Sequence, residues 1–273
     1  MQQPPLILVF DSGFGGLTVL REVMRARPDA DYIYIADSAA FPYGNLSEEQ
    51  LLARVLNVFE RLMGQYNPTI AVIACNTAST IVLPHLRGRY NIPFVGTVPA
   101  IKPAAQLSKS RLISVLATPG TVKNDYTKDL VEQFAEGCAV HLVGSKLLAS
   151  IAEAKLKGEQ ISDQDILTEI RPCFVEAHGK RTDQIVLACT HYPLLLDEFH
   201  RLAPWEVNYV DPAPAIARRV TGLIGEQDET MPQSHKRSML FTGAKPKGHD
   251  VIEMLAKFGI DAVYSLDIPL GPI

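Results

Sequence analysis

Short apolar runs alternate with longer amphipathic stretches along almost the whole chain. The apolar runs predict β-strands at residues 6–10, 32–36, 69–74, 93–97, 111–117, 139–143, 184–188, 207–211, 238–242 and 262–266. The amphipathic stretches predict helices at residues 15–26, 47–64, 77–88, 122–136, 145–156, 163–178, 193–202, 213–225 and 248–258. Because the strands are apolar along their whole length, we expect mostly parallel sheets covered by helices on both faces.

Polar residues of unusual kinds follow several of these strands. In open α/β sheets, ligands bind beyond the carboxyl ends of the strands, at loops that lead into helix N-termini. We therefore take these residues as the candidate site. They are Asp11, Ser12, Pro42, Tyr43, Gly44, Cys75, Asn76, Thr77, Thr118, Thr121, Cys189, Thr190 and His191.

Two of these strand ends share a pattern that suggests a repeat. The stretches "VIACNTAST" (72–80) and "VLACTHYPL" (186–194) both end an apolar run in Ala-Cys and continue with polar residues. A polar strand end precedes each of them at a similar distance, 64 residues before Cys75 and 71 residues before Cys189. We predict an α/β protein of two similar domains that are related by a pseudo-twofold axis.

Two Pro-rich segments mark where the chain crosses between the domains. They are "VGTVPAIKPAA" (95–105) and "VDPAPAIA" (210–217). Since the elements after the second crossing need a sheet to join, we predict a first domain of residues 1–98 plus 210–273. The second domain then comprises residues 99–209, and the active site lies in the cleft between the two domains.

Composition narrows the class of protein. The chain has 273 residues, of which 47% are hydrophobic and 21% charged, as in a globular protein with substantial cores. A net charge of −4 offers no basic surface for nucleic acid or for an anionic membrane. No apolar run reaches a membrane-spanning length and no signal peptide is apparent, so we expect a cytoplasmic protein.

The four cysteines do not form a metal or disulfide pattern. None belongs to a CxxC pair, and a reducing compartment disfavours disulfides. We expect Cys138 and Cys173 to be small buried hydrophobic residues, as free cysteines often are. Cys75 or Cys189 taken alone could have the same explanation, but their matching contexts indicate that both are used.

A pair of equivalent cysteines suits one reaction better than others. A thiolate can act as a nucleophile, a metal ligand or a base. Most neighbouring polar groups are hydroxyls and amides, which disfavours a metal. A thiol hydrolase needs one cysteine and a histidine base, and a two-lobed amino-acid-binding protein needs neither cysteine. Two bases on opposite faces of one carbon perform racemisation, in which one removes a proton and the other returns one.

Four motifs carry a family resemblance. "DSGFGGLTVLREV" (11–23), "PYG" (42–44), "ACNTAST" (74–80) and "ACTHYPLL" (188–195) resemble those of cofactor-independent glutamate racemases, in order and spacing. The resemblance implies conversion between L- and D-glutamate, which supplies D-glutamate for peptidoglycan, without PLP, any other cofactor or a metal. It also implies a homodimer. The alternative is a racemase of aspartate or of another acidic amino acid.

The resemblance also assigns roles to residues. Cys75 matches the cysteine that takes the α-proton from D-glutamate, and Cys189 matches the one that works on L-glutamate. Asp11 and His191 match groups that assist the first and the second thiol. The substrate-binding positions are Asp11, Ser12, Pro42, Tyr43, Gly44, Asn76, Thr77, Thr118, Thr121, Thr190 and His191.

Two further expectations come from the same resemblance. Glu153 falls where family members carry a glutamate near the second cysteine, within a stretch, "SKLLASIAE" (145–153), that departs from the usual family pattern. The chain begins almost at its first predicted strand, so we do not expect activation through an N-terminal extension of the kind that some members have.

Structural explanations compete with two of these roles. Asp11 stands before a predicted helix and is a residue type that caps helices. His191 precedes Tyr-Pro and could be a hydrogen-bonded histidine of a turn. The functional prediction therefore depends on the joint occurrence of these residues at successive strand ends.

Overall fold

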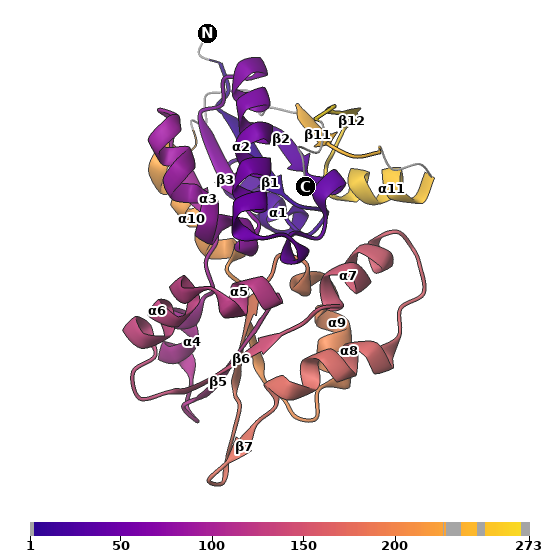
Figure 1. The fold of residues 1–273 in the computed structure, drawn as a ribbon. Helices are drawn as coiled ribbons and strands as arrows, with labels where there is room; N and C mark the ends of the chain where they lie inside the picture. The colour runs from indigo at the N-terminus through magenta and orange to yellow at the C-terminus, as the bar shows by residue number, and fades with distance from the viewer. Residues whose placement is uncertain (1–2, 226, 228–235, 245–248, 269–273) are drawn as a thin grey trace. The chain divides into compact units, whose positions relative to one another are not determined.

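The structure is a computed structural model that describes residues 3–225, 227, 236–244 and 249–268. The chain forms two compact units (Figure 1), which we call unit 1, Met1–Thr97 with Ala213–Ile273, and unit 2, Val98–Pro212. The predicted borders, 98/99 and 209/210, lie one and three residues from these.

Unit 1 is built on a parallel sheet of six strands in the order β12-β11-β2-β1-β3-β4. The strands are β1 (Leu6–Asp11), β2 (Asp31–Ala36), β3 (Ile70–Ile73), β4 (Phe94–Gly96), β11 (Arg237–Phe241) and β12 (Ala262–Ser265). The central strands β1 and β3 are almost entirely buried, which explains their continuous apolar runs.

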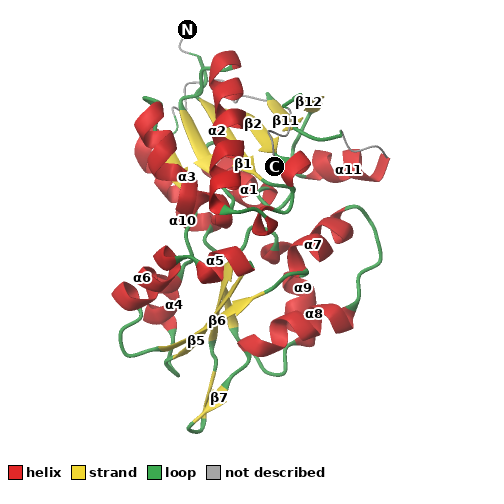
Figure 2. Ribbon diagram, viewed as in Figure 1, coloured by secondary structure: helices red, strands yellow, loops and turns green. Residues whose placement is uncertain are grey.

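Helices cover both faces of this sheet (Figure 2). Its helices are α1 (Leu17–Ala26), α2 (Glu48–Gln65), α3 (Asn76–Arg89), α10 (Ala213–Ile224) and α11 (His249–Lys257), with short 3₁₀ turns η1 (Ser38–Ala40) and η2 (Tyr43–Asn45). The buried side chains of α2 and α3 form one core with alternate residues of β1, such as Leu8 and Phe10. Helices α1 and α10 pack against each other.

Unit 2 is built on a parallel sheet of four strands in the order β10-β9-β5-β6, beside a small antiparallel hairpin. The strands are β5 (Leu112–Ala117), β6 (Ala139–Gly144), β9 (Gln184–Ala188) and β10 (Asn208–Val210), and the hairpin is β7 (Glu176–Ala177) with β8 (Lys180–Arg181). The fold class that we predicted, α/β with mostly parallel sheets, is confirmed.

Two groups of helices enclose the sheet of unit 2. The helices are α4 (Ile101–Leu107), α5 (Pro119–Lys123), α6 (Asp125–Phe134), α7 (Leu148–Leu156), α8 (Asp163–Ile170) and α9 (Leu196–Leu202), with 3₁₀ turns η3 (Arg171–Cys173) and η4 (Tyr192–Leu195). One core joins α7, α8 and α9 to residues such as Leu187 of β9. A second core joins α4 and α6 to Val186, whose side chain points to the opposite face.

The repeat that the sequence suggested is present in the topology. Four neighbouring strands of unit 1 run β2-β1-β3-β4, and the strands of unit 2 run β6-β5-β9-β10. Within each unit, the second strand along the chain lies at one side of the first, and the third and fourth follow on the other side. Each unit is therefore built on the same four-stranded pattern, to which unit 1 adds β11 and β12.

Several predicted helix bounds were wrong. The helix expected over 163–178 ends at Ile170, because the chain continues as a 3₁₀ turn and then as the β7–β8 hairpin. The helix expected over 122–136 is two helices, since Asn124 ends the first and caps the second by accepting a hydrogen bond from the Tyr126 N–H at 3.0 Å. Residue 248 of another predicted helix lies outside the described residues.

One helix was missed at the first crossing. We read residues 95–105 as a Pro-rich crossing, but α4 begins inside this segment at Ile101. Pro103 stands in the first turn of α4, where the backbone N–H that proline lacks has no helical partner anyway. Proline therefore marks the start of this helix and does not prevent it.

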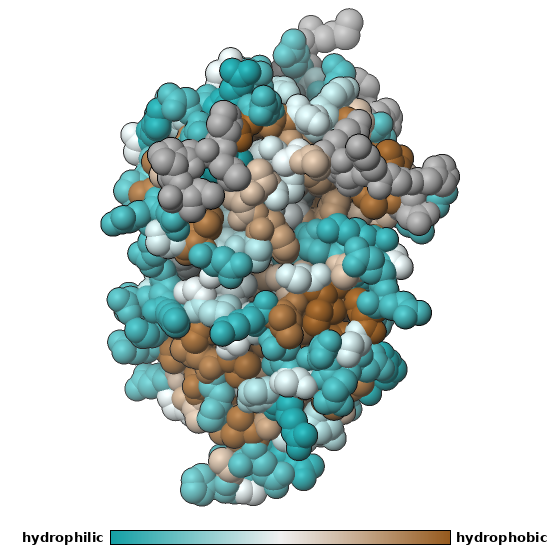
Figure 3. Space-filling view, turned by 45° about the vertical axis from the view of Figure 1, so that its right-hand side comes forward, coloured by the Kyte–Doolittle hydropathy of each residue, from teal (hydrophilic) through white to brown (hydrophobic). Residues whose placement is uncertain are grey.

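The surface carries apolar side chains from many elements. Figure 3 shows hydrophobic patches between hydrophilic side chains on one face of the molecule. In the part of the chain that the structure describes, the large apolar residues that are more than a third exposed are Leu107, Tyr126, Leu147, Leu223, Ile252 and Tyr264. They come from different elements, which is ordinary for a globular surface. Within the described residues, no helix combines the length and the apolar character that crossing a membrane requires.

Candidate active site

The carboxyl end of β1 forms a tight polar turn. Asp11 is fully buried, and its Oδ1 accepts hydrogen bonds from the Gly13 N–H at 2.9 Å and from the Ser12 hydroxyl at 3.5 Å. The Tyr34 hydroxyl donates to the Gly13 carbonyl at 2.7 Å. Helix α1 has Gly16 as its N-cap residue, so Asp11 holds this turn and does not cap the helix.

Gly16 explains one glycine of the "DSGFGG" motif. A Cβ atom on Gly16 would lie 2.7 Å from the Asp11 Cβ, 2.8 Å from the Tyr34 hydroxyl oxygen and 3.1 Å from the Ala74 Cβ. No side chain fits at those distances. Glycine therefore allows the start of α1 to lie directly over the ends of β1 and β3.

Cys75 lies at the neighbouring strand end. It follows β3 as the N-cap residue of α3, and it is 6% exposed. The Ala74 N–H donates to the Phe10 carbonyl at 2.8 Å, so the segment just before Cys75 stays paired with β1. Cys75 and Asp11 are thus brought to the same edge of one sheet, as we predicted.

Asn76 is buried, and the hydrogen-bonding groups of its side-chain amide are not satisfied. It is 2% exposed, and neither its Oδ1 nor its Nδ2 has a hydrogen-bond partner among the described residues. Leaving such a group unpaired costs about 1–3 kcal/mol. A bound ligand with both donor and acceptor groups would remove this cost, which makes Asn76 a candidate ligand contact. Thr77, the next residue, is also buried.

The "PYG" loop is anchored through its tyrosine. Tyr43 is 2% exposed, and its hydroxyl donates to Asp37 Oδ2 at 2.5 Å. Burial raises the pKa of the Tyr43 phenol well above its usual range, and Asp37 and then Cys75 raise it further. The side chain of Tyr43 faces the protein, so only the half-buried Pro42 and Gly44 and the backbone of this loop remain for a ligand.

We call the residues at these strand ends of unit 1 the first half-site. They are Asp11, Ser12, Pro42, Tyr43, Gly44, Cys75, Asn76 and Thr77.

The carboxyl end of β5 begins the corresponding region of unit 2. Thr118 is the N-cap residue of α5, and its Oγ1 accepts a hydrogen bond from the Thr121 N–H at 3.4 Å. The two hydroxyl oxygens lie 3.1 Å apart, and Thr121 is buried. The two predicted threonines are therefore brought together by one helix start.

Cys189 is joined to a histidine and a glutamate. Its Sγ lies 3.8 Å from His191 Nδ1, and His191 Nε2 lies 2.9 Å from Glu153 Oε1 on α7. Cys189, His191 and Glu153 are 7%, 2% and 6% exposed. Lys157 is a further neighbour of Glu153, with its Nζ 3.8 Å from Oε2. Glu153 thus contacts the histidine, which in turn lies beside Cys189.

These contacts determine which ring nitrogen of His191 carries the hydrogen. An ionised carboxylate only accepts hydrogen bonds, so with Glu153 ionised the ring hydrogen lies on Nε2. The lone pair of Nδ1 then faces the Cys189 thiol and is able to receive its proton.

We call the corresponding residues of unit 2 the second half-site. They are Thr118, Thr121, Glu153, Cys189, Thr190 and His191.

The two cysteines occupy equivalent positions in the two sheets. In unit 1, Ile73 of β3 lies two residues before Cys75 and pairs with Phe10 of β1. In unit 2, Leu187 of β9 lies two residues before Cys189 and pairs with Leu116 of β5. Cys75 and Cys189 therefore lie at the same height beyond equivalent strands. Spacing along the chain suggested this equivalence, and the strand register establishes it.

The groups that are predicted to assist the two cysteines are not equivalent. In the same register, the counterpart of Asp11 is Ala117, since each is the last paired residue of its strand. The counterpart of His191 is Thr77, because each follows its cysteine by two residues. The first half-site therefore has a carboxylate and no imidazole at these positions, and the second has an imidazole and no carboxylate.

Sequence reasoning missed the polar residues behind the first half-site. Asp37 follows β2 directly, at the same edge as the predicted residues, and pairs with the buried Arg54 of α2. Arg54 carried a signal, because it lies on the apolar face of its helix with Leu51 and Val58 at helical spacing. A charged residue at such a position needs a buried partner.

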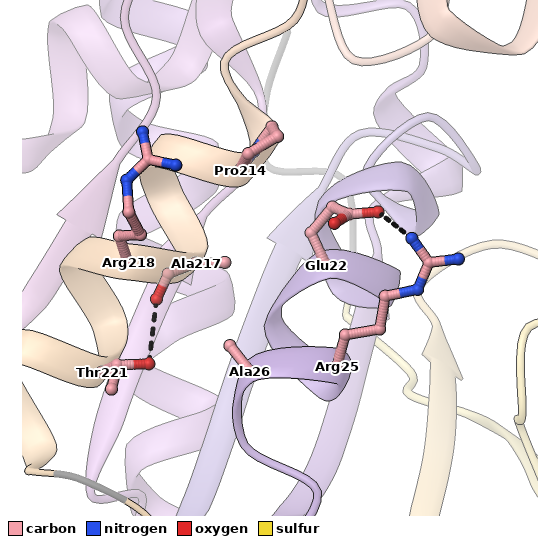
Figure 4. Close-up of a pocket in the computed structure, with 7 residues that line it drawn as sticks. All are labelled: Glu22, Arg25, Ala26, Pro214, Ala217, Arg218 and Thr221. Carbon is pink, nitrogen blue, oxygen red and sulfur yellow. Dashed lines mark hydrogen bonds and ion pairs between the residues drawn. The ribbon is translucent and has the colours of Figure 1, made fainter.

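A groove of about 490 Å³ lies elsewhere in unit 1, between α1 and α10 (Figure 4). It is lined by Glu22, Arg25, Ala26, Pro214, Ala217, Arg218 and Thr221. Arg25 donates to Glu22 at 2.8 Å, within the groove wall. None of the predicted site residues lines this groove.

Known proteins resemble the chain over nearly its whole length. The sequence model of the Asp/Glu/Hydantoin racemase family matches residues 17–220. The glutamate racemase of Brucella canis is 53% identical over 256 residues, which are 93% of this chain and 92% of that protein. The chain therefore belongs to the Asp/Glu/Hydantoin racemase family.

Similar solved structures agree with this family, and two that match with high TM-scores are glutamate racemases. Escherichia coli glutamate racemase, solved in complex with L-glutamate and the activator UDP-MurNAc-Ala, matches with a TM-score of 0.87 at 39% identity, over 96% of this chain and 98% of that one. A glutamate racemase isoform of Bacillus anthracis matches with a TM-score of 0.81 at 26% identity, over 98% and 99% of the two chains. The resemblance to glutamate racemases is confirmed.

Proposed function

We propose that this protein interconverts L- and D-glutamate by a two-base mechanism in which Cys75 and Cys189 act on opposite faces of one α-carbon. The observation that carries this proposal is the equivalent register of the two cysteines in two sheets of the same topology. A hydrolase or a binding protein has no use for a second thiol in an equivalent place. A racemase needs two groups of matched chemistry, because either enantiomer is substrate and product.

The proton moves between the two thiols through the substrate. Cys75 takes the α-proton from D-glutamate, Cys189 takes it from L-glutamate, and the other thiol donates a proton to the opposite face. One cysteine is a thiolate and the other a thiol at the start of each turnover, and the two exchange states during it. Asp11 assists Cys75, and His191, oriented by Glu153, assists Cys189.

The remaining residues bind the dicarboxylate. The Asn76 amide, which has no hydrogen-bond partner within the described part of the chain, contacts the substrate with both its donor and its acceptor. Backbone N–H groups of the "PYG" loop and of the helix starts donate to carboxylates. Hydroxyl donors come from Ser12, Thr77, Thr118, Thr121 and Thr190.

The difficult step is removal of the α-proton, which is far less acidic than a thiol. The proposed reaction uses no PLP and no metal, so the protein itself must stabilise the charge that develops on the α-carboxylate. Hydroxyl and N–H donors fixed in a site that excludes water do this most effectively, since they are already oriented when the charge appears.

The proposed biological role follows from the product. D-glutamate is used in peptidoglycan, so the protein supplies a precursor of the cell wall and thereby supports cell shape. We propose a cytoplasmic homodimer that binds neither nucleic acid nor membrane. Light scattering of the purified protein tests the dimer directly, and a monomer at micromolar concentration would contradict it.

Solvent isotope incorporation tests the reaction. Purified protein is incubated in D₂O without PLP, with L-glutamate, D-glutamate, L-aspartate or D-aspartate, and NMR and chiral chromatography follow the Cα hydrogen and the enantiomers. We expect racemisation of glutamate alone, with deuterium in the product enantiomer and little in the remaining substrate. Racemisation of aspartate instead would select the alternative substrate. Binding of glutamate without any exchange would mean that the protein is a binding module.

A further inference from the structure

A buried ion pair lies behind the first half-site. Asp37 is fully buried, and Arg54 is 7% exposed. The guanidinium meets the carboxylate with both Nε, at 3.0 Å from Oδ2, and Nη2, at 2.6 Å from Oδ1. Such a fork fixes the carboxylate in orientation as well as in position.

The pair is connected to the substrate loop on one side. Asp37 Oδ2 accepts the hydrogen bond from the Tyr43 hydroxyl, and the Asp37 N–H donates to the Asp11 carbonyl at 2.9 Å. The Tyr43 ring packs in the same apolar cluster as Cys75 and lies 6.3 Å from the Phe10 ring. A shift of Asp37 would therefore be passed to the loop that carries Gly44.

The pair is connected to the C-terminal part of the chain on the other side. Thr242, directly after β11, donates from its hydroxyl to Asp37 Oδ1 at 2.5 Å and accepts from the Ala39 N–H at 3.3 Å. Arg54 Nη1 donates to the Ile268 carbonyl at 3.2 Å. Residues more than 200 positions apart in sequence thus meet on one carboxylate.

We propose that Asp37 is a positioning residue for glutamate, which holds the "PYG" loop in its binding geometry through Tyr43 and ties that geometry to the C-terminal strands through Thr242. The inference rests on the proposed function. It assigns a task to Asp37, Arg54 and Thr242, which are all buried and are proposed to act through the loop. The loop contacts the substrate and the transition state equally. Loss of the hydrogen bonds that hold the loop therefore raises KM and leaves kcat nearly unchanged.

A matched pair of tyrosine variants separates positioning from general stability. Tyr32 is as buried as Tyr43, and its hydroxyl donates to the Arg27 carbonyl at 2.7 Å, inside unit 1 and outside the first half-site. We expect Tyr43→Phe and Tyr32→Phe to lower the melting temperature by similar amounts, about 2–4 °C. Only Tyr43→Phe raises the KM for glutamate, by about tenfold, with kcat within about twofold.

A second pair of variants tests the link to the C-terminal strands. Thr242→Val removes the hydroxyl and keeps the shape, whereas Thr242→Ser keeps the hydroxyl. We expect Thr242→Val to raise KM about threefold to tenfold and Thr242→Ser to remain near the wild type. This pair leaves the Asp37–Arg54 ion pair intact, so it avoids the misfolding that removal of one buried charge causes.

The outcomes distinguish this inference from the proposed function. If KM in Tyr43→Phe stays within twofold of wild type, or changes no more than in Tyr32→Phe, Asp37 has no positioning task. Equal KM values for Thr242→Val and Thr242→Ser overturn the link to β11. If the wild type binds glutamate without racemising it, the proposed reaction is wrong. The positioning task of Asp37 is then tested by comparing the dissociation constants of the same variants for glutamate, measured by calorimetry. A wild type that does not bind glutamate overturns both.

Discussion

At the residue scale, the two cysteines are placed alike but have different polar neighbours. Cys75 shares its sheet edge with the buried carboxylate of Asp11, whereas Cys189 faces an imidazole that Glu153 orients. L- and D-glutamate have equal free energies in water, so kcat/KM is the same in both directions for every variant. The difference between the half-sites therefore shows in the separate kcat and KM values of the two directions and, most directly, in partial reactions.

Alanine in place of either cysteine makes this difference visible. In Cys189→Ala, Cys75 still removes the α-proton of D-glutamate but no thiol donates to the other face. We expect racemisation to fall by about 10²–10⁴-fold, while D-glutamate exchanges its α-proton with D₂O and keeps its configuration. Cys75→Ala is expected to show the same behaviour with L-glutamate. NMR and chiral chromatography of each enantiomer measure both processes.

The control for these variants is Cys138→Ala, because Cys138 lies on unit 2 outside both half-sites. It is expected to racemise glutamate at the wild-type rate. Near-normal racemisation by Cys75→Ala or by Cys189→Ala would refute the two-base mechanism.

Glu153 is predicted to act through its charge. In Glu153→Gln the amide fits the same space but no longer fixes the ring hydrogen on His191 Nε2 or stabilises a protonated ring. We expect kcat to fall about 10–100-fold with little change in melting temperature. Glu198→Gln is the control, because Glu198 is another largely buried carboxylate of unit 2 that pairs with Lys155 at 2.7 Å. If the two variants lose activity equally, the effect is structural.

At the element scale, single side chains join the ends of neighbouring elements. Asp183, just before β9, accepts hydrogen bonds at 2.7 Å from the Ser108 hydroxyl and from the Lys109 N–H, and at 2.9 Å from the Ser110 N–H. These bonds fix the turn between α4 and β5 against β9. Burial alone would raise the pKa of Asp183, but the hydrogen bonds from Ser110, Ser108 and Lys109 outweigh it and lower the pKa.

The lowered pKa predicts acid sensitivity of unit 2. Because the folded pKa lies below the unfolded value of about 3.9, the stabilisation is complete above that value and is lost as the pH falls below it. Asp183→Asn is expected to cost about 1 kcal/mol at neutral pH, since the carboxylate is only half-buried and partly screened. The difference from wild type should shrink toward pH 3, as measured by urea unfolding.

The matched control is Asp163→Asn, which removes an exposed partner of Arg201. An exposed ion pair contributes little to stability, so this variant should unfold like the wild type at every pH. A constant difference between Asp183→Asn and wild type across the pH range would contradict the assigned cause.

Helices and strands were predictable where a local hydrophobic pattern determines them. They were not predictable where pairing with a segment further along the chain determines them. The buried parallel strands appear as apolar runs because both of their faces are covered. The end of the helix at Ile170 was missed, since residues 171–178 have no strong breaker except one proline and the hairpin forms by pairing with a segment further on. Strand-end site residues were predictable for a related reason, because parallel strands deliver their ends to one edge.

At the scale of the whole molecule, the sequence could not reveal contacts between distant segments. Thr242 and Asp37 are 205 residues apart, and nothing in the local sequence of either indicates the other. Arg54 gave a partial signal as a charge on an apolar helix face, but its partner could not be read from the helix. The topology brings these residues together because β11 pairs beside β2 and both end at the same edge.

The proposal that both half-sites act on one glutamate predicts joint protection of two thiols. Cys75 and Cys189 are each slightly exposed, and they are expected to react slowly with iodoacetamide in the free protein. If one substrate molecule contacts both half-sites, saturating glutamate should slow alkylation of both cysteines with the same concentration dependence. Peptide mass spectrometry after timed labelling measures each site separately.

The other two cysteines are internal controls in that experiment. Burial raises the pKa of Cys173 to about 12 and the residue is fully buried, so it should remain unlabelled with or without glutamate. Cys138 is half-buried and should be labelled at a rate that glutamate does not change. Protection of only one of Cys75 and Cys189, or protection at two different glutamate concentrations, would show that the half-sites bind independently. The two-base mechanism would then lack its central requirement, which is that both thiols reach the same α-carbon.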